Sequence, residues 1–209
     1  MTLRLNGATS GFTEIDSPAI GGSNTLLLPG SNGSAYQFLR NGATAGTTEF
    51  AAAITSGTVV ASTSGTSIDF TSIPSYVKRI TVMFANCSRS GSSHPLIQLG
   101  DAGGFETTGY LGSGSQIGTA SASTSAFTSG FGVNLGGSGT IVYHGTVSVF
   151  LIDSNTWACS GVTGRSDATS TGATAGSKTL SDTLTQIRIT HVNGTDTFDA
   201  GSINILYEG

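Results

Sequence analysis

From about residue 57 onward, apolar and polar residues alternate in runs that are separated by Gly, Ser, Asn and Pro. In the run VKRITVMFANC, Ile80, Val82 and Phe84 fall on one side of an extended chain, while Thr81 falls on the other. Because successive side chains of a strand point to opposite faces, this alternation predicts a half-buried β-strand. About ten such runs follow one another between turn signals, which predicts an all-β fold: an antiparallel β-sandwich, with the jelly roll as the preferred topology.

Two runs are expected to belong to the core sheet. The longest and most apolar run is Gly139–Asp153, in which Gly145 is a predicted bulge or bend. Its candidates for inward-facing positions are Ile141, Tyr143, Val147, Val149 and Leu151. In the final run, Ser202–Gly209, Ile203 and Ile205 recur at alternate positions, as in a strand that buries one face.

Other stretches of this region lack a clear strand pattern. Gly112–Ser125 and Asp167–Ser177 are rich in Ser and Gly, so we expect loops there. One helical turn is the weaker expectation for SIPSYVK, Ser72–Lys78.

Residues 1–50 differ from the rest because their apolar runs are only three to six residues long: TLRL, FTEID, TLLLP and YQFLRN. Strands this short cannot enclose a core and need a neighbouring surface, which the same segment of a second chain would supply. We therefore expect an attachment and oligomerisation segment at 1–50, a connection at 51–62 and a head domain at 63–209. The residues expected to mediate attachment and oligomerisation are Phe12, Ile15, Leu26, Leu27, Leu28, Tyr36, Phe38 and Leu39.

Charge and hydropathy narrow the range of partners. Charged residues make up 10% of the chain and the net charge is −4, with no basic stripe that would indicate nucleic-acid binding. No run approaches the ~18 apolar residues of a membrane span. The N-terminal MTLRLNGATSG also lacks the apolar core of a secretory signal. We expect synthesis in the cytoplasm, no nucleic-acid partner and no membrane insertion.

The cysteines and acidic residues offer little evidence for a bound group. For Cys87 and Cys159, two buried thiols are the favoured interpretation and a disulfide between neighbouring strands is the alternative. Asp196 and Asp199 could offer oxygen ligands to calcium, but turn formation by Asp is the favoured interpretation. We expect no metal and no cofactor.

No pair of residues makes a strong case for catalysis. A polysaccharide-cleaving site needs two carboxylates that face each other across a groove. Asp101 and Glu106 are close in sequence and could meet in space, but carboxylates in turns are more often structural. His144 and His191 lie within strand patterns, and no nucleophile-elbow motif accompanies them. We expect that the protein is not an enzyme, and a glycan-degrading enzyme is the least favoured function.

Binding is the more plausible chemistry, because a rigid sandwich can present loop residues to a ligand. Aromatic rings and amides match the faces and hydroxyl groups of sugars. Tyr110 beside Gly109 is expected to be exposed. For Trp157 the alternative interpretation is that it packs in the core. The candidate receptor-binding residues are Tyr110, His94, Gln116 and Trp157, and His94 is also expected to be exposed.

The stretch SGFTEIDSPAIGGSNTLLLPGSNGSAYQFLRNG, Ser10–Gly42, resembles the N-terminal module of structural proteins of tailed phages, particularly marine and cyanobacterial ones. The similar elements are Gly11–Asp16, Ser23–Pro29 and Gly33–Gly42. Phe70–Tyr110 and the closing DAGSINILYEG are similar to a β-rich domain of phage tail fibres and related virion proteins.

This resemblance implies a homotrimer with an N-terminal attachment region and a head that meets the host surface. The expected function is that of a short trimeric tail fibre or tip that mediates adsorption to the host cell. The alternative is a capsid decoration protein or head fibre. The implied location is the virion, and the implied partners are other chains of the same protein, other virion proteins of the tail or baseplate (alternatively the capsid), and a host surface glycan or protein.

Overall fold

The computed structural model describes residues 3–6, 10, 12–15, 25–42, 44–133 and 136–209. The chain divides into an N-terminal unit, Met1–Ala53, and a sandwich unit, Ile54–Gly209, and each is described here by itself. Within the described residues the secondary structure is all strand, bridge, turn and bend, so the predicted all-β class is confirmed. None of the described elements is a helix that could cross a membrane.

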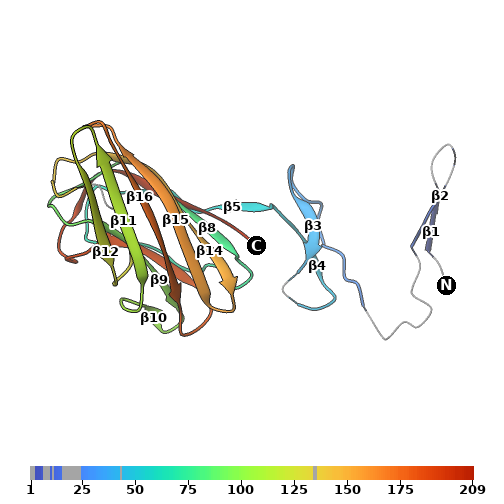
Figure 1. The fold of residues 1–209 in the computed structure, drawn as a ribbon. Coiled ribbons are helices and arrows are strands. Elements are labelled where there is room, and N and C mark those ends of the chain that lie inside the picture. Colours follow the sequence, from blue (N-terminus) through green and yellow to red (C-terminus); the bar gives the residue numbers. More distant parts are fainter. Residues whose placement is uncertain (1–2, 7–9, 11, 16–24, 43, 134–135) are drawn as a thin grey trace. The chain divides into compact units, whose positions relative to one another are not determined.

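The N-terminal unit contains two small hairpins (Figure 1). In the first, β1 (Leu3–Asn6) pairs with β2 (Phe12–Ile15), and in the second, β3 (Phe38–Asn41) pairs with β4 (Thr48–Ala51). The predicted TLLLP strand is reduced to a single parallel bridge between Leu27 and Thr47. Two-stranded hairpins are marginal on their own in water, so the two described hairpins gain little stability from their own pairing.

The sandwich unit consists of two antiparallel sheets (Figure 1). The larger sheet has the order β12-β11-β16-β15-β14-β8-β18-β5, with β6 also paired to β18. The smaller sheet has the order β10-β9-β17-β7, with β13 also paired to β9. The jelly roll stays a prediction, because β14, β15 and β16 follow one another in the larger sheet as a simple meander.

The bounds of these strands follow the alternating runs of the sequence in most cases. Those of the larger sheet are β5 (Ile54–Ser56), β6 (Val60–Ala61), β8 (Arg79–Arg89), β11 (Leu111–Gly118), β12 (Ala122–Phe127), β14 (Tyr143–Asp153), β15 (Thr156–Arg165), β16 (Ser170–Thr179) and β18 (Phe198–Glu208). Those of the smaller sheet are β7 (Ile68–Phe70), β9 (Pro95–Asp101), β10 (Gly104–Phe105), β13 (Phe131–Gly132) and β17 (Gln186–His191).

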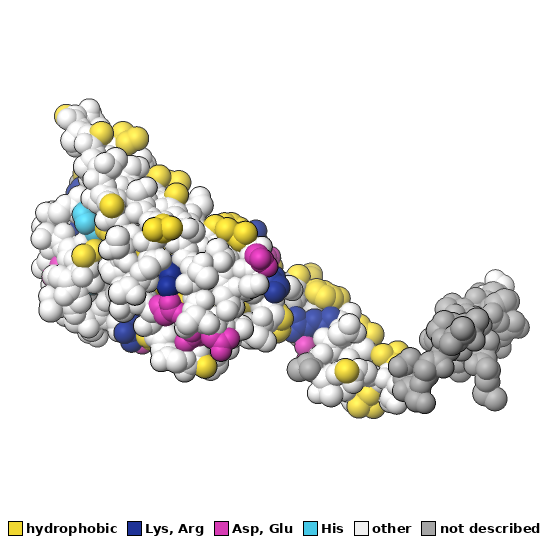
Figure 2. Space-filling view, turned by 60° about the horizontal axis from the view of Figure 1, so that its bottom comes forward, with side chains coloured by type: hydrophobic (Ala, Val, Ile, Leu, Met, Phe, Trp, Pro, Cys, Tyr) yellow, Lys and Arg dark blue, Asp and Glu magenta, His cyan; other side chains and the backbone are white. Residues whose placement is uncertain are grey.

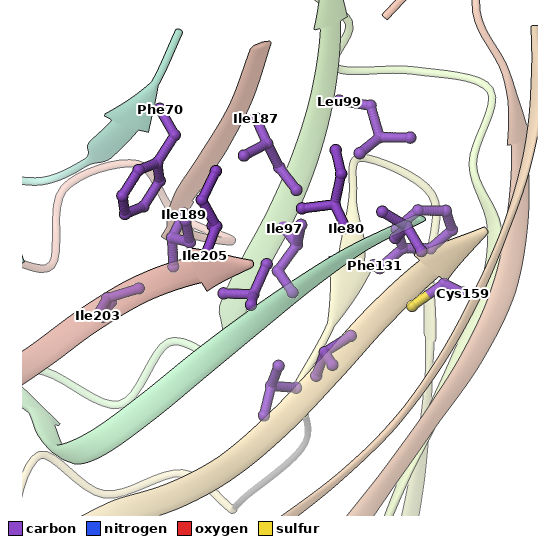
Figure 3. Packing of buried hydrophobic residues seen from close by; sticks show 14 of the residues in the cluster. Phe70, Ile80, Ile97, Leu99, Phe131, Cys159, Ile187, Ile189, Ile203 and Ile205 are labelled. Carbon is purple, nitrogen blue, oxygen red and sulfur yellow. The ribbon is translucent and has the colours of Figure 1, made fainter. Parts of the chain in front are cut away.

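The core lies between the two sheets. Figure 3 shows Ile97 and Leu99 of the smaller sheet and Ile80 and Ile205 of the larger one in the same packed layer. The inward positions predicted for the run Gly139–Asp153 are buried, except that Leu151 is half-buried at the margin of the core. Strands in which apolar and polar side chains alternate have one apolar face, and packing two sheets together buries that face of each sheet.

The final strand, β18, lies inside the larger sheet. It pairs with β8 over most of its length and with β5 and β6 on its other side. Ile203 and Ile205 are buried, which confirms that this run belongs to the core sheet.

The two Ser/Gly-rich stretches are strands, and the prediction of loops there is wrong. Residues 112–125 form most of β11 and β12, and residues 167–177 lead into and form most of β16. The hydrogen-bond ladder uses the backbone only, so it tolerates residues with almost no side chain. At Gly176 the small residue is required, because a β-carbon there would lie 2.6 Å from the carbonyl oxygen of Leu111.

Two local predictions have opposite outcomes. The helical turn expected at Ser72–Lys78 is wrong: the segment is a turn in which the Val77 amide donates to the Pro74 carbonyl at 3.1 Å. Ser72 has a φ of 60°, outside the helical region, and Val77 is buried in the core. The bulge predicted at Gly145 is confirmed, since its φ is 132° and the register with β8 shifts between Tyr143 and Gly145.

Candidate functional site

Tyr110 is a core residue, and the expectation of an exposed ring is wrong. Its side chain is 1% exposed, and its hydroxyl accepts from the Leu99 amide at 2.7 Å and donates to the Glu106 carbonyl at 3.1 Å. Its ring packs edge-to-face on Phe131, and burial raises the pKa of the phenol. Gly109 has a φ of 74°, a turn conformation that precedes the inward-facing tyrosine.

Trp157 is also buried, as its alternative interpretation predicted. Trp157 and Cys159 are two residues apart on β15, and both side chains lie on its buried inner face. Cys87 and Cys159 are both free thiols, which confirms the favoured interpretation, and burial raises the pKa of Cys159 to about 12. A thiol with so high a pKa is a packing group and not a nucleophile.

His94 and Gln116 are half-buried, so the expectation of an exposed His94 is also wrong. The His94 ring packs edge-to-face on Phe127, and burial together with the charge of Arg89 lowers its pKa. The Gln116 amide donates to Ser170 Oγ at 2.8 Å. The four candidate receptor-binding residues therefore form no common surface patch, because Tyr110 and Trp157 are in the core.

Asp101 and Glu106 do meet in space, through Ser181. The Ser181 hydroxyl donates to Asp101 Oδ2 at 2.7 Å and lies 2.9 Å from Glu106 Oε1, which also accepts from the Ser181 amide. Hydrogen bonds from Ser181 and Gly103 lower the pKa of Asp101. Burial alone would raise the pKa of Glu106, but hydrogen bonds from Lys178 and Ser181 outweigh it and lower that pKa. Both groups are held as carboxylates, whereas a glycosidase needs one raised pKa.

Of Asp196 and Asp199, which could have offered calcium ligands, Asp196 serves a turn and Asp199 bonds across to the neighbouring strand β8. Asp196 accepts from the Ser93 amide at 2.8 Å and from the Asn193 amide group at 2.6 Å, and Asp199 accepts from Ser88 Oγ. Across the described ranges, no group of three or more His, Cys, Asp or Glu side chains is arranged to hold a metal ion.

A different candidate site lies on the outer face of the smaller sheet. It is a groove of about 360 Å³, called here the polar groove. Because Ile97, Leu99, Ile187 and Ile189 face the core, the intervening side chains of β9 and β17 face outward into this groove. Its polar lining includes Thr66, Gln98, Thr107, Ser129, Arg188 and Thr190.

Hydrogen bonds fix several groups of the polar groove. The Gln98 amide donates to the Ser129 carbonyl at 2.8 Å, and the Thr190 hydroxyl donates to the Thr66 carbonyl at 2.8 Å. The loop that contains Ser129 approaches β9 closely, since a β-carbon on Gly130 would lie 3.0 Å from the carbonyl oxygen of Ile97. The walls of the groove are therefore held before any ligand arrives.

Arg188 is the charged member of the polar groove, and it is paired. Its Nε and Nη2 donate to the two carboxylate oxygens of Asp69, both at 2.7 Å, and this raises the pKa of the guanidinium. The guanidinium also stacks over the Phe105 ring, 4.1 Å from its centroid. A neutralised pair among hydroxyl and amide groups suits a ligand with many hydroxyl groups better than one with high charge.

The surface as a whole is poor in charge. On the face of the sandwich unit drawn in Figure 2, acidic and basic side chains gather near one margin, and most of the surface is uncharged. Ion pairs account for much of the charge of the sandwich unit, since Lys178 pairs with Glu106, Arg79 with Glu208 and Arg188 with Asp69.

Sequence reasoning missed the polar groove, although part of its signal was present. The outward positions Gln98, Arg188 and Thr190 are the polar half of two alternating runs. What the sequence did not reveal is that β9 and β17, which are far apart in the chain, are neighbours in the smaller sheet.

The attachment residues of the N-terminal unit are exposed wherever the structure describes them. Between residues 25 and 53 none of the described residues is buried, and Tyr36 is 98% exposed. Leu26, Leu27, Leu28, Phe38 and Leu39 are exposed as well. The side chains of Phe12 and Ile15 lie outside the described part of the chain.

Comparisons with protein-family models, with curated proteins and with solved structures find no match to this chain. Two surfaces of the chain could engage other molecules: the exposed apolar residues of the N-terminal unit and the polar groove.

Proposed function

We propose that this chain is a structural virion protein that forms a short trimeric tail fibre or tip, and that its sandwich unit adsorbs to a glycan of the host surface. In this proposal the N-terminal unit joins the chain to two other copies and to the particle. The polar groove is the receptor site, and it binds without cleaving.

The observation that carries the proposal is the contrast within one chain. The N-terminal unit exposes Leu26, Leu27, Leu28 and Tyr36 and has no buried residue between positions 25 and 53 among those described. Exposed apolar clusters of this kind are typical of surfaces that other chains cover. The sandwich unit has its own core, so it can present a rigid site.

The chemistry of the polar groove supports a glycan as the ligand. Sugar hydroxyl groups need both donors and acceptors, and the Thr107 hydroxyl and the Arg188 guanidinium offer them within one groove. Val192, which is 49% exposed, adds an apolar contact for the C–H face of a sugar ring. The ionised Asp101 and Glu106 are tied to Ser181, which supports binding over hydrolysis.

A glycan array that carries bacterial surface polysaccharides tests this site. We expect the labelled full-length protein to bind a subset of the array. The variant Thr107→Trp should abolish binding, because Thr107 is exposed at the groove and an indole there would fill it. The matched control is Thr119→Trp, which places the same side chain on the exposed β11–β12 turn and should leave binding intact.

Absence of binding to every glycan, or binding that survives Thr107→Trp, would contradict the groove as the receptor site. Release of sugar from a bound polysaccharide would instead favour an enzyme. Immunogold labelling of particles separates the tail fibre from the alternative, since label on the head would indicate a capsid decoration protein or head fibre.

A further inference from the structure

The last residue of β8, Arg89, is a buried cation with few partners. It is 0% exposed, and its Nη2 donates to the Gly136 carbonyl at 2.7 Å. The described residues offer its Nε and Nη1 no hydrogen-bond acceptor, and no carboxylate among them forms an ion pair with it. A buried guanidinium in this condition is costly, because it has lost water without gaining a full set of acceptors.

The carboxylates whose charges act on Arg89 already accept hydrogen bonds from other groups. Asp196 and Asp167 act on Arg89 through space. Asp196 accepts hydrogen bonds from Ser93 and Asn193, and Asp167 accepts them from Arg165 and the Val142 amide. The two carboxylates compensate part of the positive charge of Arg89, but neither accepts a hydrogen bond from its guanidinium.

A second donor without a partner lies on the adjoining strand. Tyr143 of β14 is fully buried, and its hydroxyl has no hydrogen-bond partner in the described structure. Tyr143 is paired with Cys87, two residues before Arg89 on β8. On the other side, Arg89 pairs with Phe198, whose ring contacts His191 at 4.6 Å between centroids.

We propose that this end of the sandwich binds one small inorganic anion of the size and charge of chloride, held by the Arg89 guanidinium and the Tyr143 hydroxyl. The anion accepts hydrogen bonds from both groups and neutralises the buried cation. One ligand therefore supplies both the hydrogen-bond acceptor and the negative charge that the protein lacks at this place. The Arg89–Gly136 hydrogen bond ties the segment after β13 to the same site. An ordered water could accept the hydrogen bonds but would leave the charge uncompensated.

The test compares the melting temperature of the full-length protein in sodium chloride and in sodium gluconate at equal ionic strength. Gluconate is too large for an enclosed site, so it controls for general screening of charge. A bound anion stabilises the folded state in proportion to ln(1 + [L]/Kd). We expect the melting temperature to rise by several degrees with chloride and to stay flat with gluconate. Equal melting temperatures in the two salts would overturn the proposal and would favour water.

Three variants localise the effect. Tyr143→Phe keeps the ring and removes the hydroxyl, and should move the chloride dependence to several-fold higher concentration. Arg89→Met should abolish the dependence. Arg188→Met is the matched control, since it removes a guanidinium that is paired and partly exposed, and should leave the chloride dependence unchanged. A dependence that persists in both site variants would overturn the proposal.

Crystals grown in sodium bromide supply a readout that needs no variant. We expect an anomalous peak within hydrogen-bond distance of Arg89 and the Tyr143 hydroxyl. A site without such a peak would overturn the proposal, even if Arg89→Met fails to fold.

Discussion

In the sandwich unit, large apolar side chains lie between two sheets, whereas in the N-terminal unit side chains of the same kinds face solvent. Ile205 is 2% exposed, and Leu27 is 60% exposed. Both units are antiparallel β-structure, although the N-terminal strands have four residues each and the longest strands of the sandwich unit have 11. The difference between them is the second layer: a strand buries an apolar face only where another sheet or chain covers it.

The contrast has an energetic side. Full burial of a Val, Leu, Ile or Phe side chain contributes about 1.5–3 kcal/mol to folding, and an exposed one contributes little. The sandwich unit collects many such contributions in one cluster that includes Ile80, Val82, Ile97 and Ile187. Among the described residues between 25 and 53 the N-terminal unit collects none, so these residues gain no such stabilisation from within the unit.

Deletion of Ser202–Gly209 should have the largest effect. It removes most of β18, with the buried Ile203 and Ile205, and leaves β5, β6 and most of β8 without their neighbour. We expect the sandwich unit to lose cooperative folding, with no thermal transition in circular dichroism. A truncated protein that still melts cooperatively would show that β18 is dispensable.

Deletion of residues 1–53 should change assembly and not folding. Light scattering of the full-length protein should give a trimer, about three times the 21.0 kDa chain. The truncated protein should be monomeric, and its melting temperature should lie within a few degrees of the full-length value, because the core is complete without those residues.

Two results of this experiment would change the comparison. A trimer that survives the truncation would place the contact between chains on the sandwich unit. A full-length monomer would mean that the exposed apolar residues are covered by a different partner.

Mild acid should have the smallest effect, and only on the sandwich unit, because residues 1–53 contain no histidine. Burial, reinforced by the charge of Arg89, lowers the pKa values of His94 and His191 below 6.5, and Asp196 only partly opposes this at His191. The unfolded chain therefore binds protons first as pH falls below 6.5, so the free energy of unfolding decreases, by at most about 1.4 kcal/mol per pH unit for each histidine.

Denaturant unfolding at several pH values between 7 and 5 measures this slope. The variant His191→Gln removes one of the two groups, so its slope should be smaller than that of the parent protein. A free energy of unfolding that stays constant over this range would contradict the effect of burial on both histidines.

The sequence was most informative where side chains alternate and least informative where they are small. The pattern of Ile80, Val82 and Phe84 predicted β8 and its buried face correctly. In β16 the alternation is between Thr, Ala, Gly and Ser, whose hydropathies differ too little to reveal a face, so the strand was taken for a loop.

The candidate site was harder to predict for a different reason. Tyr110 was expected at the surface because glycine neighbours suggest a loop, yet Gly109 forms the turn that precedes the ring in the core. The polar groove depends on the pairing of β9 with β17, a long-range contact that no local pattern encodes. Sequence periodicity specifies which side of a strand is buried, but not which strands are neighbours.

The position of β18 also sets the order of events during translation. β5, β6 and β8 leave the ribosome well before β18, the strand to which all three pair. Until β18 emerges, β8 presents an open edge with unpaired backbone groups, as a nascent sheet does when one of its inner strands is missing. Closure of the larger sheet is therefore a late and non-local event, and chains that stall before it are the ones most exposed to pairing with the wrong neighbour.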